Sequence, residues 1–110
     1  MRRWGIGFMK KILLVCEAGM STSILLSKMR EYVKVKKVDI DIKALPITEC
    51  EEVINDVDIV LLSPQVRFQM PQVNALVNGR VPVKVIDVIL YGMMNEKAIL
   101  DQVLNLLDKK

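Results

Sequence analysis

The chain lacks several features, and each absence excludes a class of protein or of site. It contains no histidine, so no imidazole is available to act as a general base. No segment is rich in serine, glycine or proline, which argues against disorder and flexible linkers. No run of about twenty apolar residues is present, so we expect no direct membrane insertion. The two cysteines, with no signal-peptide pattern before them, indicate a cytoplasmic location rather than a disulfide.

Net charge is also small. The formal value is +3, from 16 basic and 13 acidic residues. Arg2 and Arg3 are two of the basic residues, so the chain from residue 9 onward carries almost no net charge. A near-neutral domain has no electrostatic basis for binding nucleic acid. We expect one domain over residues 9–110, long enough to bury its own core, preceded by an N-terminal extension over residues 1–8. We expect no metal and no cofactor.

Strand and helix patterns alternate four times along the chain. The 38–44 run alternates apolar and polar residues like an edge strand, whereas 57–63 is almost continuously apolar like a central strand. Together the apolar runs predict strands over 11–15, 38–44, 57–63 and 82–87. Apolar residues at helical spacing predict helices over 25–33 and 66–77 and from about Asn95, with a shorter helix from about residue 49. The expected fold class is α/β, a single four-stranded parallel sheet in the order 2-1-3-4 with helices on both faces.

Local signals refine the ends of the helices. Thr48 and Glu51 have the spacing of a capping box for the short helix. Pro71 implies a kink in the third helix or a later start than its apolar stripe suggests, and Asn78-Gly79 closes that helix. Cys50 lies among carboxylates, which disfavour its thiolate. We therefore interpret Cys50 as a structural or half-exposed thiol.

The candidate site begins at Cys16, where the first strand ends and the first helix begins. Free N–H groups and the positive end of the helix dipole converge at such a junction, so it binds anions and lowers the pKa of a thiol. The small and hydroxyl residues that follow allow a turn and donate hydrogen bonds. A phosphate-binding loop is therefore predicted, formed by Glu17, Ala18, Gly19, Met20, Ser21, Thr22 and Ser23. The alternative is that Cys16 is a small buried hydrophobic residue and the loop only caps the helix.

The sheet order places this loop beside two other segments. In a doubly wound sheet the ligand site lies at the carboxyl ends of the strands where the winding reverses, here between the first and third strands. The turn that begins at Ser63 and the segment 87–92 should lie at the same edge. Possible contacts for phosphate or a partner protein are Pro64, Gln65, Phe68 and Tyr91, with Met20 at the tip of the loop. A polar helix start would also explain the glutamine, and core packing would also explain the two aromatic residues.

Three motifs in this order resemble a known family. The segment from Cys16 to Ser23, Pro64-Gln65-Val66 after the third strand and Tyr91-Gly92 after the fourth are similar to the lactose/cellobiose-type enzyme IIB of the bacterial phosphoenolpyruvate-dependent sugar phosphotransferase system. The resemblance spans roughly residues 9 to 108. It implies a three-layer sandwich like that of low-molecular-weight tyrosine phosphatases or flavodoxin.

The same resemblance implies a cytoplasmic phosphocarrier, with Cys16 as the phosphorylated nucleophile and the loop through Ser23 as its phosphate-binding segment. Cys16 would take phosphate from a phosphohistidine of enzyme IIA. It would pass the phosphate to a sugar such as cellobiose, lactose, chitobiose or a related oligosaccharide, held by membrane enzyme IIC. Glu17 departs from the small or neutral residue that the family pattern leads us to expect. We predict that its carboxylate points outward while its backbone N–H still serves the loop.

Two other functions stay open at this point. A phosphatase-like or arsenate-reductase-like hydrolase would use the same thiol. Low-molecular-weight tyrosine phosphatases, however, carry an arginine at the sixth position after their cysteine, and Thr22 stands there in this chain. A regulatory domain with a degenerate site is the other alternative, and the intact cysteine counts against it.

Overall fold

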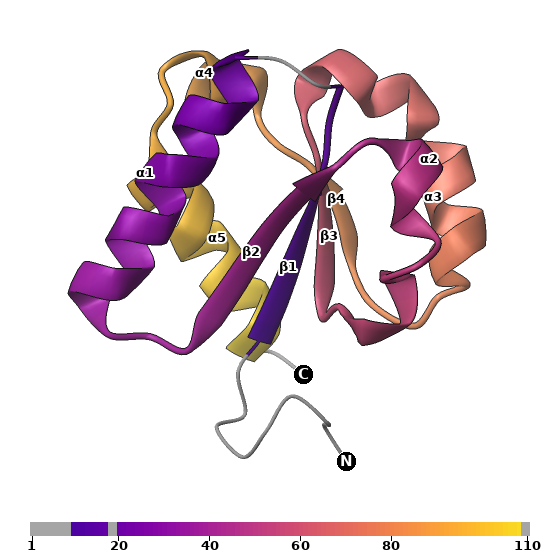
Figure 1. Ribbon diagram of the computed structural model, residues 1–110, viewed down its shortest axis with the longest axis horizontal. Coiled ribbons are helices and arrows are strands. Elements are labelled where there is room, and N and C mark those ends of the chain that lie inside the picture. The colour runs from indigo at the N-terminus through magenta and orange to yellow at the C-terminus, as the bar shows by residue number, and fades with distance from the viewer. Residues whose placement is uncertain (1–9, 18–19, 109–110) are drawn as a thin grey trace.

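The protein is described by a computed structural model over residues 10–17 and 20–108 (Figure 1). The predicted extension over residues 1–8 and the loop residues Ala18 and Gly19 lie outside the described residues. All strand pairs of the sheet are parallel, and the order β2-β1-β3-β4 confirms the predicted topology. The strands are β1 (Lys10–Val15), β2 (Ile40–Leu45), β3 (Ile59–Leu62) and β4 (Val83–Val85).

The two central strands, β1 and β3, supply apolar side chains to both faces of the sheet. Leu14 of β1 and Leu61 of β3 are partners across the strands and lie in one apolar cluster. Val15 and Leu62, the next pair, lie in the other cluster. Successive residues of a strand project to opposite faces, and paired residues of parallel strands project to the same face. The register therefore decides which side chains each layer of helices meets.

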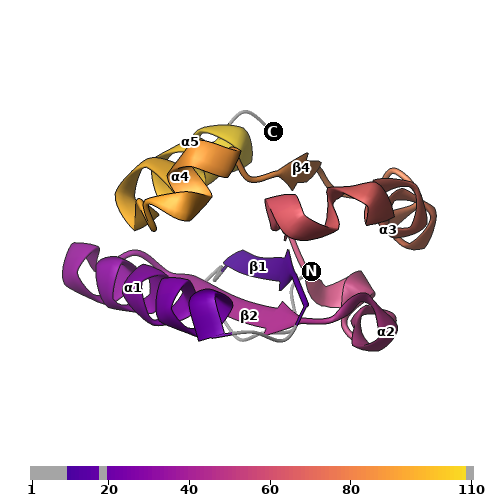
Figure 2. The same ribbon diagram turned by 90° about the horizontal axis from the view of Figure 1, so that it is seen from above.

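Helices cover both faces, giving three layers (Figure 1, Figure 2). One face carries α1 (Met20–Lys36), α4 (Val88–Gly92) and α5 (Glu96–Asp108). The other carries α2 (Ile47–Cys50) and α3 (Met70–Val77), with the 3₁₀ turns η1 (Ile54–Asp56) and η2 (Pro64–Gln69). Within the part of the chain that the structure describes, none of the helices has the length and apolar character needed to cross a bilayer.

The two long helices pack through the apolar residues that the sequence predicts. In α1, Leu25, Met29 and Val33 are buried against the sheet. In α5, Ile99 and Val103 enter the same cluster. Residues at this spacing share one face of a helix, so each helix presents an apolar side to the core and a polar side to solvent.

Two predictions near the edge of the sheet differ from the structure. The capping box at Thr48 is wrong, because the N-cap of α2 is Pro46, which makes no side-chain cap bond, and Thr48 lies inside the helix. The third strand, predicted over 57–63, is shorter at both ends, because β3 covers only Ile59–Leu62. The Asp58 carboxylate accepts a hydrogen bond from the backbone N–H of Lys11 at 2.8 Å. This N–H group of β1 is therefore paired with the side chain of the residue that precedes β3.

The helix that follows β4 is absent from the sequence prediction. α4 is only 5 residues long, too short to show helical periodicity, and its N-cap is Asp87. The Asp87 Oδ1 accepts hydrogen bonds from the N–H groups of Ile89 at 2.8 Å and Leu90 at 3.2 Å. An aspartate that caps a helix in this way satisfies N–H groups that have no partner inside the helix.

Both ends of α3 agree with residues that the sequence indicates as helix boundaries. α3 begins at Met70 with Pro71 in its first turn, so the later start is the correct alternative. Its C-cap is Asn78, whose φ of 55° is left-handed, and Gly79 continues with a φ of 78°. Asparagine and glycine are the residues that adopt this conformation at lowest cost.

Candidate active site

Cys16 lies at the carboxyl end of β1, between the ends of two neighbouring strands. Its backbone N–H donates to the carbonyl of Leu45 at the end of β2, at 3.1 Å. On the other side, the N–H of Ser63 donates to the carbonyl of Val15 at 3.0 Å. The winding of the sheet reverses between β1 and β3, so Cys16 occupies the predicted position.

A pair of hydroxyl groups connects Cys16 with the helices above it. The side chain of Thr22, in the first turns of α1, is hydrogen-bonded to the Cys16 thiol. Thr22 Oγ1 also lies 2.9 Å from Tyr91 Oη, which belongs to α4. Thr22 and Tyr91 are buried, so this pair is sheltered from competing water. Tyr91, which is distant in sequence, is thereby connected to the Cys16 thiol through Thr22.

The ionisation of Cys16 differs from the sequence prediction. Burial raises the pKa of the Cys16 thiol above its usual value of 9.0, and the hydrogen bond from Thr22 lowers it only in part. The prediction of a lowered pKa is therefore wrong for this arrangement. The reason is desolvation: Cys16 is only 5% exposed, and a thiolate that loses its water is disfavoured. Near neutral pH the protonated thiol is the stable form.

The predicted loop residues lie partly outside the described structure. Glu17 is exposed, as the prediction of an outward carboxylate requires. Met20 and Ser21 open α1, and their side chains are outside the described residues. Thr22 is buried, and Ser23 is exposed on α1.

The other predicted contacts are arranged around Cys16 in different ways. Tyr91 is buried in the core and directs its hydroxyl to Thr22, so packing and a polar contact occur together. Pro64 is partly buried at the start of η2. Gln65 and Phe68 are exposed on the same turn, so neither packs in the core.

Apart from Phe68, the exposed apolar residues at this end of the sheet are absent from the sequence prediction. Five apolar side chains that are between 47% and 68% exposed lie on α1, η2 and α4, the elements that follow β1, β3 and β4. We call them the apolar rim, and they are Ile24, Phe68, Val88, Ile89 and Met93. Asp87 before a short apolar run was the available signal for α4 and its part of the rim. Ser63 is the other unpredicted residue at this edge.

The second cysteine is buried, so of the two predicted forms the structural thiol is correct and the half-exposed one is wrong. Cys50 is 1% exposed, and its Sγ donates to the carbonyl of Pro46 at 3.3 Å. Burial, followed by the nearby charges of Cys16 and Glu49, raises the pKa of the Cys50 thiol to about 11. The Glu49 carboxylate contributes to this effect as expected, but desolvation is the largest cause.

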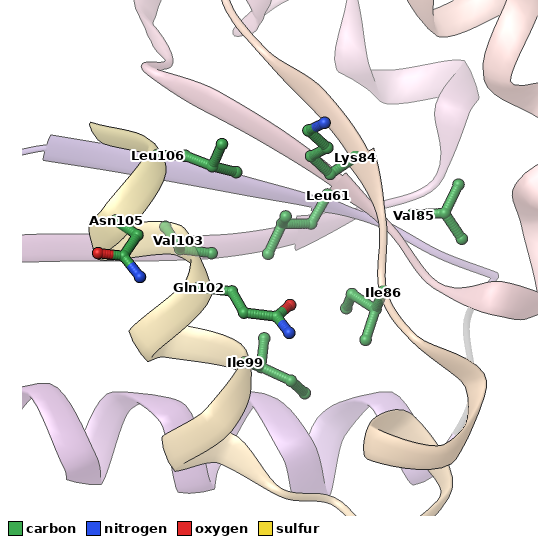
Figure 3. A pocket seen from close by; sticks show the side chains of 9 residues that line it. All are labelled: Leu61, Lys84, Val85, Ile86, Ile99, Gln102, Val103, Asn105 and Leu106. Carbon is green, nitrogen blue, oxygen red and sulfur yellow. The ribbon is translucent and has the colours of Figure 1, made fainter. Parts of the chain in front are cut away.

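A separate hollow lies away from this site. It has a volume of about 330 Å³ and runs between β4 and α5, where Ile86 and Val103 line its apolar wall (Figure 3). Lys84 and Gln102 supply polar groups at its border. Cys16, Thr22 and Tyr91 take no part in its lining. Among the described residues, no group of three or more His, Cys, Asp or Glu side chains is arranged to hold a metal.

The chain matches a family model over most of its length. Residues 11–102 match the family described as "PTS system, Lactose/Cellobiose specific IIB subunit". The chain belongs to this family. IIB components are phosphotransferases of the phosphoenolpyruvate-dependent sugar phosphotransferase system and work with IIA and IIC components. The family resemblance of the three sequence motifs is thus confirmed.

Relatives of this IIB chain are named for different sugars. It is 37% identical over 100 residues to the oligo-beta-mannoside-specific EIIB component of Bacillus subtilis (strain 168), covering 90% of this chain and 97% of the relative. It is 36% identical over 106 residues to the galactose-specific EIIB component of Lactococcus lactis subsp. cremoris (strain MG1363), with the same two coverages.

A solved structure of the same family has the same fold. The solution structure of the cellobiose-specific phosphotransferase IIB component protein from Borrelia burgdorferi matches with a TM-score of 0.78 and 37% identity. The match covers 93% of this chain and 94% of that chain. The three names differ in the sugar at nearly equal identity, so similarity does not select a sugar for this IIB chain.

Proposed function

We propose that this protein is a cytoplasmic phosphocarrier that accepts a phosphoryl group on Cys16. The donor is a phosphohistidine of enzyme IIA, and the acceptor is a sugar held by membrane enzyme IIC. The observation that carries the proposal is the position of Cys16, a buried thiol at the strand end, hydrogen-bonded to Thr22 where α1 begins. Cellobiose, lactose, chitobiose or a related oligosaccharide fits the family, and sugar choice belongs to the IIC component.

The first transfer is a displacement at phosphorus. Cys16 loses its proton, and the thiolate attacks the phosphorus atom, so a sulfur–phosphorus bond forms while the nitrogen–phosphorus bond breaks. The histidine nitrogen leaves with the electron pair and takes up a proton, which balances the one that the thiol lost. In the second transfer a sugar hydroxyl attacks phosphorus, the thiolate leaves, and the hydroxyl proton restores the thiol.

Because the pKa of the Cys16 thiol is raised, the proposed transfer requires that the thiol lose its proton while the phosphorylated donor is bound. The described pocket stabilises the protonated thiol, so the thiolate has to form as the phosphoryl group arrives. Thr22 supplies a hydrogen bond to the developing charge on sulfur. The proposed phosphate contacts are the N–H groups of the loop over residues 17–23, which act as preorganised donors to phosphoryl oxygens.

The absence of an arginine clamp favours a carrier over a hydrolase. Thr22 occupies the position of the phosphatase arginine, and its hydroxyl is engaged by Tyr91 and Cys16. A guanidinium binds two phosphoryl oxygens at once and stabilises the charge that builds up in hydrolysis. Without an arginine, the loop binds the phosphocysteine but does not accelerate the transfer of its phosphoryl group to water.

The apolar rim is the surface that we propose for docking IIA and IIC. Its side chains are exposed on the three elements that follow β1, β3 and β4, and Cys16 lies where β1 ends. Exposed apolar groups clustered at one edge are typical of protein contact surfaces. Gln65 and Pro64, on the same turn as Phe68, are proposed as further contacts.

Intact-mass measurement tests the carrier function directly. Enzyme IIA charged from phosphoenolpyruvate by the general proteins of the system should transfer about one phosphate to the wild type. Cys50→Ser should gain the same mass, and Cys16→Ser should gain none. Phosphate on Cys50, or on the Cys16→Ser protein, would contradict the assignment.

A second assay separates carrier from hydrolase. The isolated protein should turn over an aryl phosphate very slowly, while its phosphocysteine persists long enough to be isolated. Rapid multiple turnover that is lost in Cys16→Ser would instead establish the phosphatase-like alternative.

A further inference from the structure

Ser63 is a buried hydroxyl residue next to the nucleophile. It follows β3 directly and has 0% of its surface exposed. Its Oγ has no hydrogen-bond partner among the described residues. A buried hydroxyl without a partner costs free energy, and such groups are rare in folded proteins. An unpaired hydroxyl at a functional edge of the sheet therefore needs an explanation.

The register of β1 and β3 places Ser63 beside Cys16. The last paired residues of the two strands are Val15 and Leu62. Cys16 and Ser63 are therefore the next residues after these two adjacent strands. The bond from the Ser63 N–H to the Val15 carbonyl, at 3.0 Å, continues the ladder at this point. Adjacent strands lie about 4.8 Å apart, so the two residues are neighbours at the end of the sheet.

Both side chains belong to the same face of the sheet. Leu14 and Leu61, two residues earlier on each strand, lie in the cluster beneath α1, α4 and α5. Side chains two residues apart on a strand share a face. The Cys16 thiol does reach α1 on this face, because Thr22 is its hydrogen-bond partner. The alternation thus brings the free hydroxyl of Ser63 and the thiol to one side.

We propose that Ser63 is a further catalytic residue of the phosphotransfer, donating a hydrogen bond from its Oγ to the Cys16 sulfur while that sulfur carries negative charge. This inference rests on the proposed function of Cys16. The sulfur is negative twice in the cycle, as the attacking thiolate and as the leaving group toward the sugar. Ser63 and Thr22 then supply two donors to the thiolate, and hydrogen bonds to charged groups are stronger than those between neutral groups.

The arrangement also accounts for the unpaired hydroxyl in the protonated state. Ser63 Oγ makes no hydrogen bond among the described residues of the resting protein, and a thiolate is a stronger acceptor than a neutral thiol, so the proposed bond forms when Cys16 ionises. The unpaired hydroxyl therefore raises the free energy of the resting protein, and the bond to the thiolate removes this unfavourable contribution during the reaction. Interactions that are stronger in the charged state than in the resting state are the ones that accelerate a reaction.

The test compares Ser63→Ala with Ser63→Gly, which is also small and lacks the hydroxyl, and with Ser27→Ala, an exposed serine on α1. The pH profile of Cys16 alkylation is measured by peptide mass mapping after iodoacetamide treatment. Both Ser63 variants should alkylate Cys16 about tenfold more slowly at neutral pH, the size expected for one hydrogen bond to a charged group. Ser27→Ala should match the wild type.

Thermal unfolding separates this role from a structural one. Because Ser63 Oγ has no described partner, Ser63→Ala should unfold at the wild-type temperature or above it. A wild-type alkylation profile in both Ser63 variants would overturn the inference, whatever their stability.

Alkylation requires no phosphate donor, so the two proposals fail separately. If the wild type takes no phosphate from enzyme IIA but the Ser63 variants shift the alkylation profile, the carrier function is wrong and Ser63 is still a donor to the thiolate. If the wild type is phosphorylated and the Ser63 variants match it in both assays, the carrier function stands and Ser63 has no part in it.

Discussion

Thr22 Oγ1 and Tyr91 Oη lie 2.9 Å apart, although 69 positions separate them in the chain. This contact joins the start of α1 to α4 across the top of the sheet. Thr22 is at the same time the hydrogen-bond partner of the Cys16 thiol. When the thiolate forms, Thr22 donates its only hydroxyl proton to sulfur, and the Tyr91 hydroxyl donates to Thr22. The tyrosine thereby fixes the orientation of the group that serves the nucleophile.

Thr22→Val should impair the nucleophile while keeping the shape of the buried side chain. We expect Cys16 alkylation at neutral pH to slow about tenfold, because a hydrogen bond to a charged group contributes about 1.5–3 kcal/mol. Unfolding free energy should fall by about 1 kcal/mol, since the Tyr91 hydroxyl loses its partner. The pH profile of alkylation and urea unfolding are the measurements. Thr48→Val, at an exposed position of α2, is the control, and identical profiles for both variants would refute the role of Thr22.

The sheet was predictable because its signal is local. The run that forms β3 is apolar on both faces, and β2 alternates, so central and edge positions follow from hydrophobic pattern alone. The order of the strands then located Cys16 at the reversal of the winding. A motif at a strand end acquires its position from the topology, so the position of Cys16 in the sheet follows from the sequence alone.

The remainder depends on packing that no local pattern contains. The Thr22–Tyr91 pair arises where α4 meets α1, and α4 is too short to leave a periodic signal. The pKa of Cys16 was predicted in the wrong direction because a loop sequence shows donors but not burial. The unpaired hydroxyl of Ser63 likewise depends on the three-dimensional surroundings of that side chain, which no local pattern specifies.

The stability of the protein should fall in alkaline solution because of Cys50. Its pKa is about 11 in the folded state against 9.0 for an ordinary thiol, so the folded protein keeps a proton that the unfolded chain releases. This contribution to stability is complete below about pH 9 and is lost as the pH rises toward about 11. Two pKa units correspond to a loss of about 3 kcal/mol at most.

Cys50→Ser isolates this contribution. A serine hydroxyl can donate to the Pro46 carbonyl as the thiol does, but it does not titrate in this range. Unfolding free energies of the two proteins, measured in urea at several pH values, should therefore converge or cross between about pH 9 and pH 11. A constant difference over this range would show that the Cys50 thiol ionises equally in the folded and unfolded states.

Phe68→Ser should weaken transfer between proteins without changing the chemistry of Cys16. Phe68 is 68% exposed on the apolar rim, so its loss removes partner contact and little internal packing. We expect the KM for phosphorylated enzyme IIA to rise about tenfold, the effect of an interface residue that contributes somewhat more than 1 kcal/mol. Alkylation of Cys16 should be unchanged, and unfolding free energy should stay within about 0.5 kcal/mol of wild type.

Val35→Ser is the matched control for the rim. Val35 is 67% exposed but lies near the last turn of α1, at the end of the helix far from Cys16. Equal effects of the two substitutions on KM would mean that the docking surface extends well beyond the rim. No effect from either would place the docking surface elsewhere.

Glu17 should influence partner choice more than the nucleophile that it follows. Its side chain is exposed, so water screens the carboxylate from the buried sulfur. Across about 8 Å at an effective dielectric constant of about 60, Coulomb's law changes the fraction of thiolate about threefold. Glu17→Ser should therefore alkylate Cys16 about threefold faster at neutral pH, while its rate of phosphorylation by different enzyme IIA proteins changes more. The pH profile of alkylation measures the first effect, and an increase above about tenfold would mean that the carboxylate faces the thiol and not the solvent.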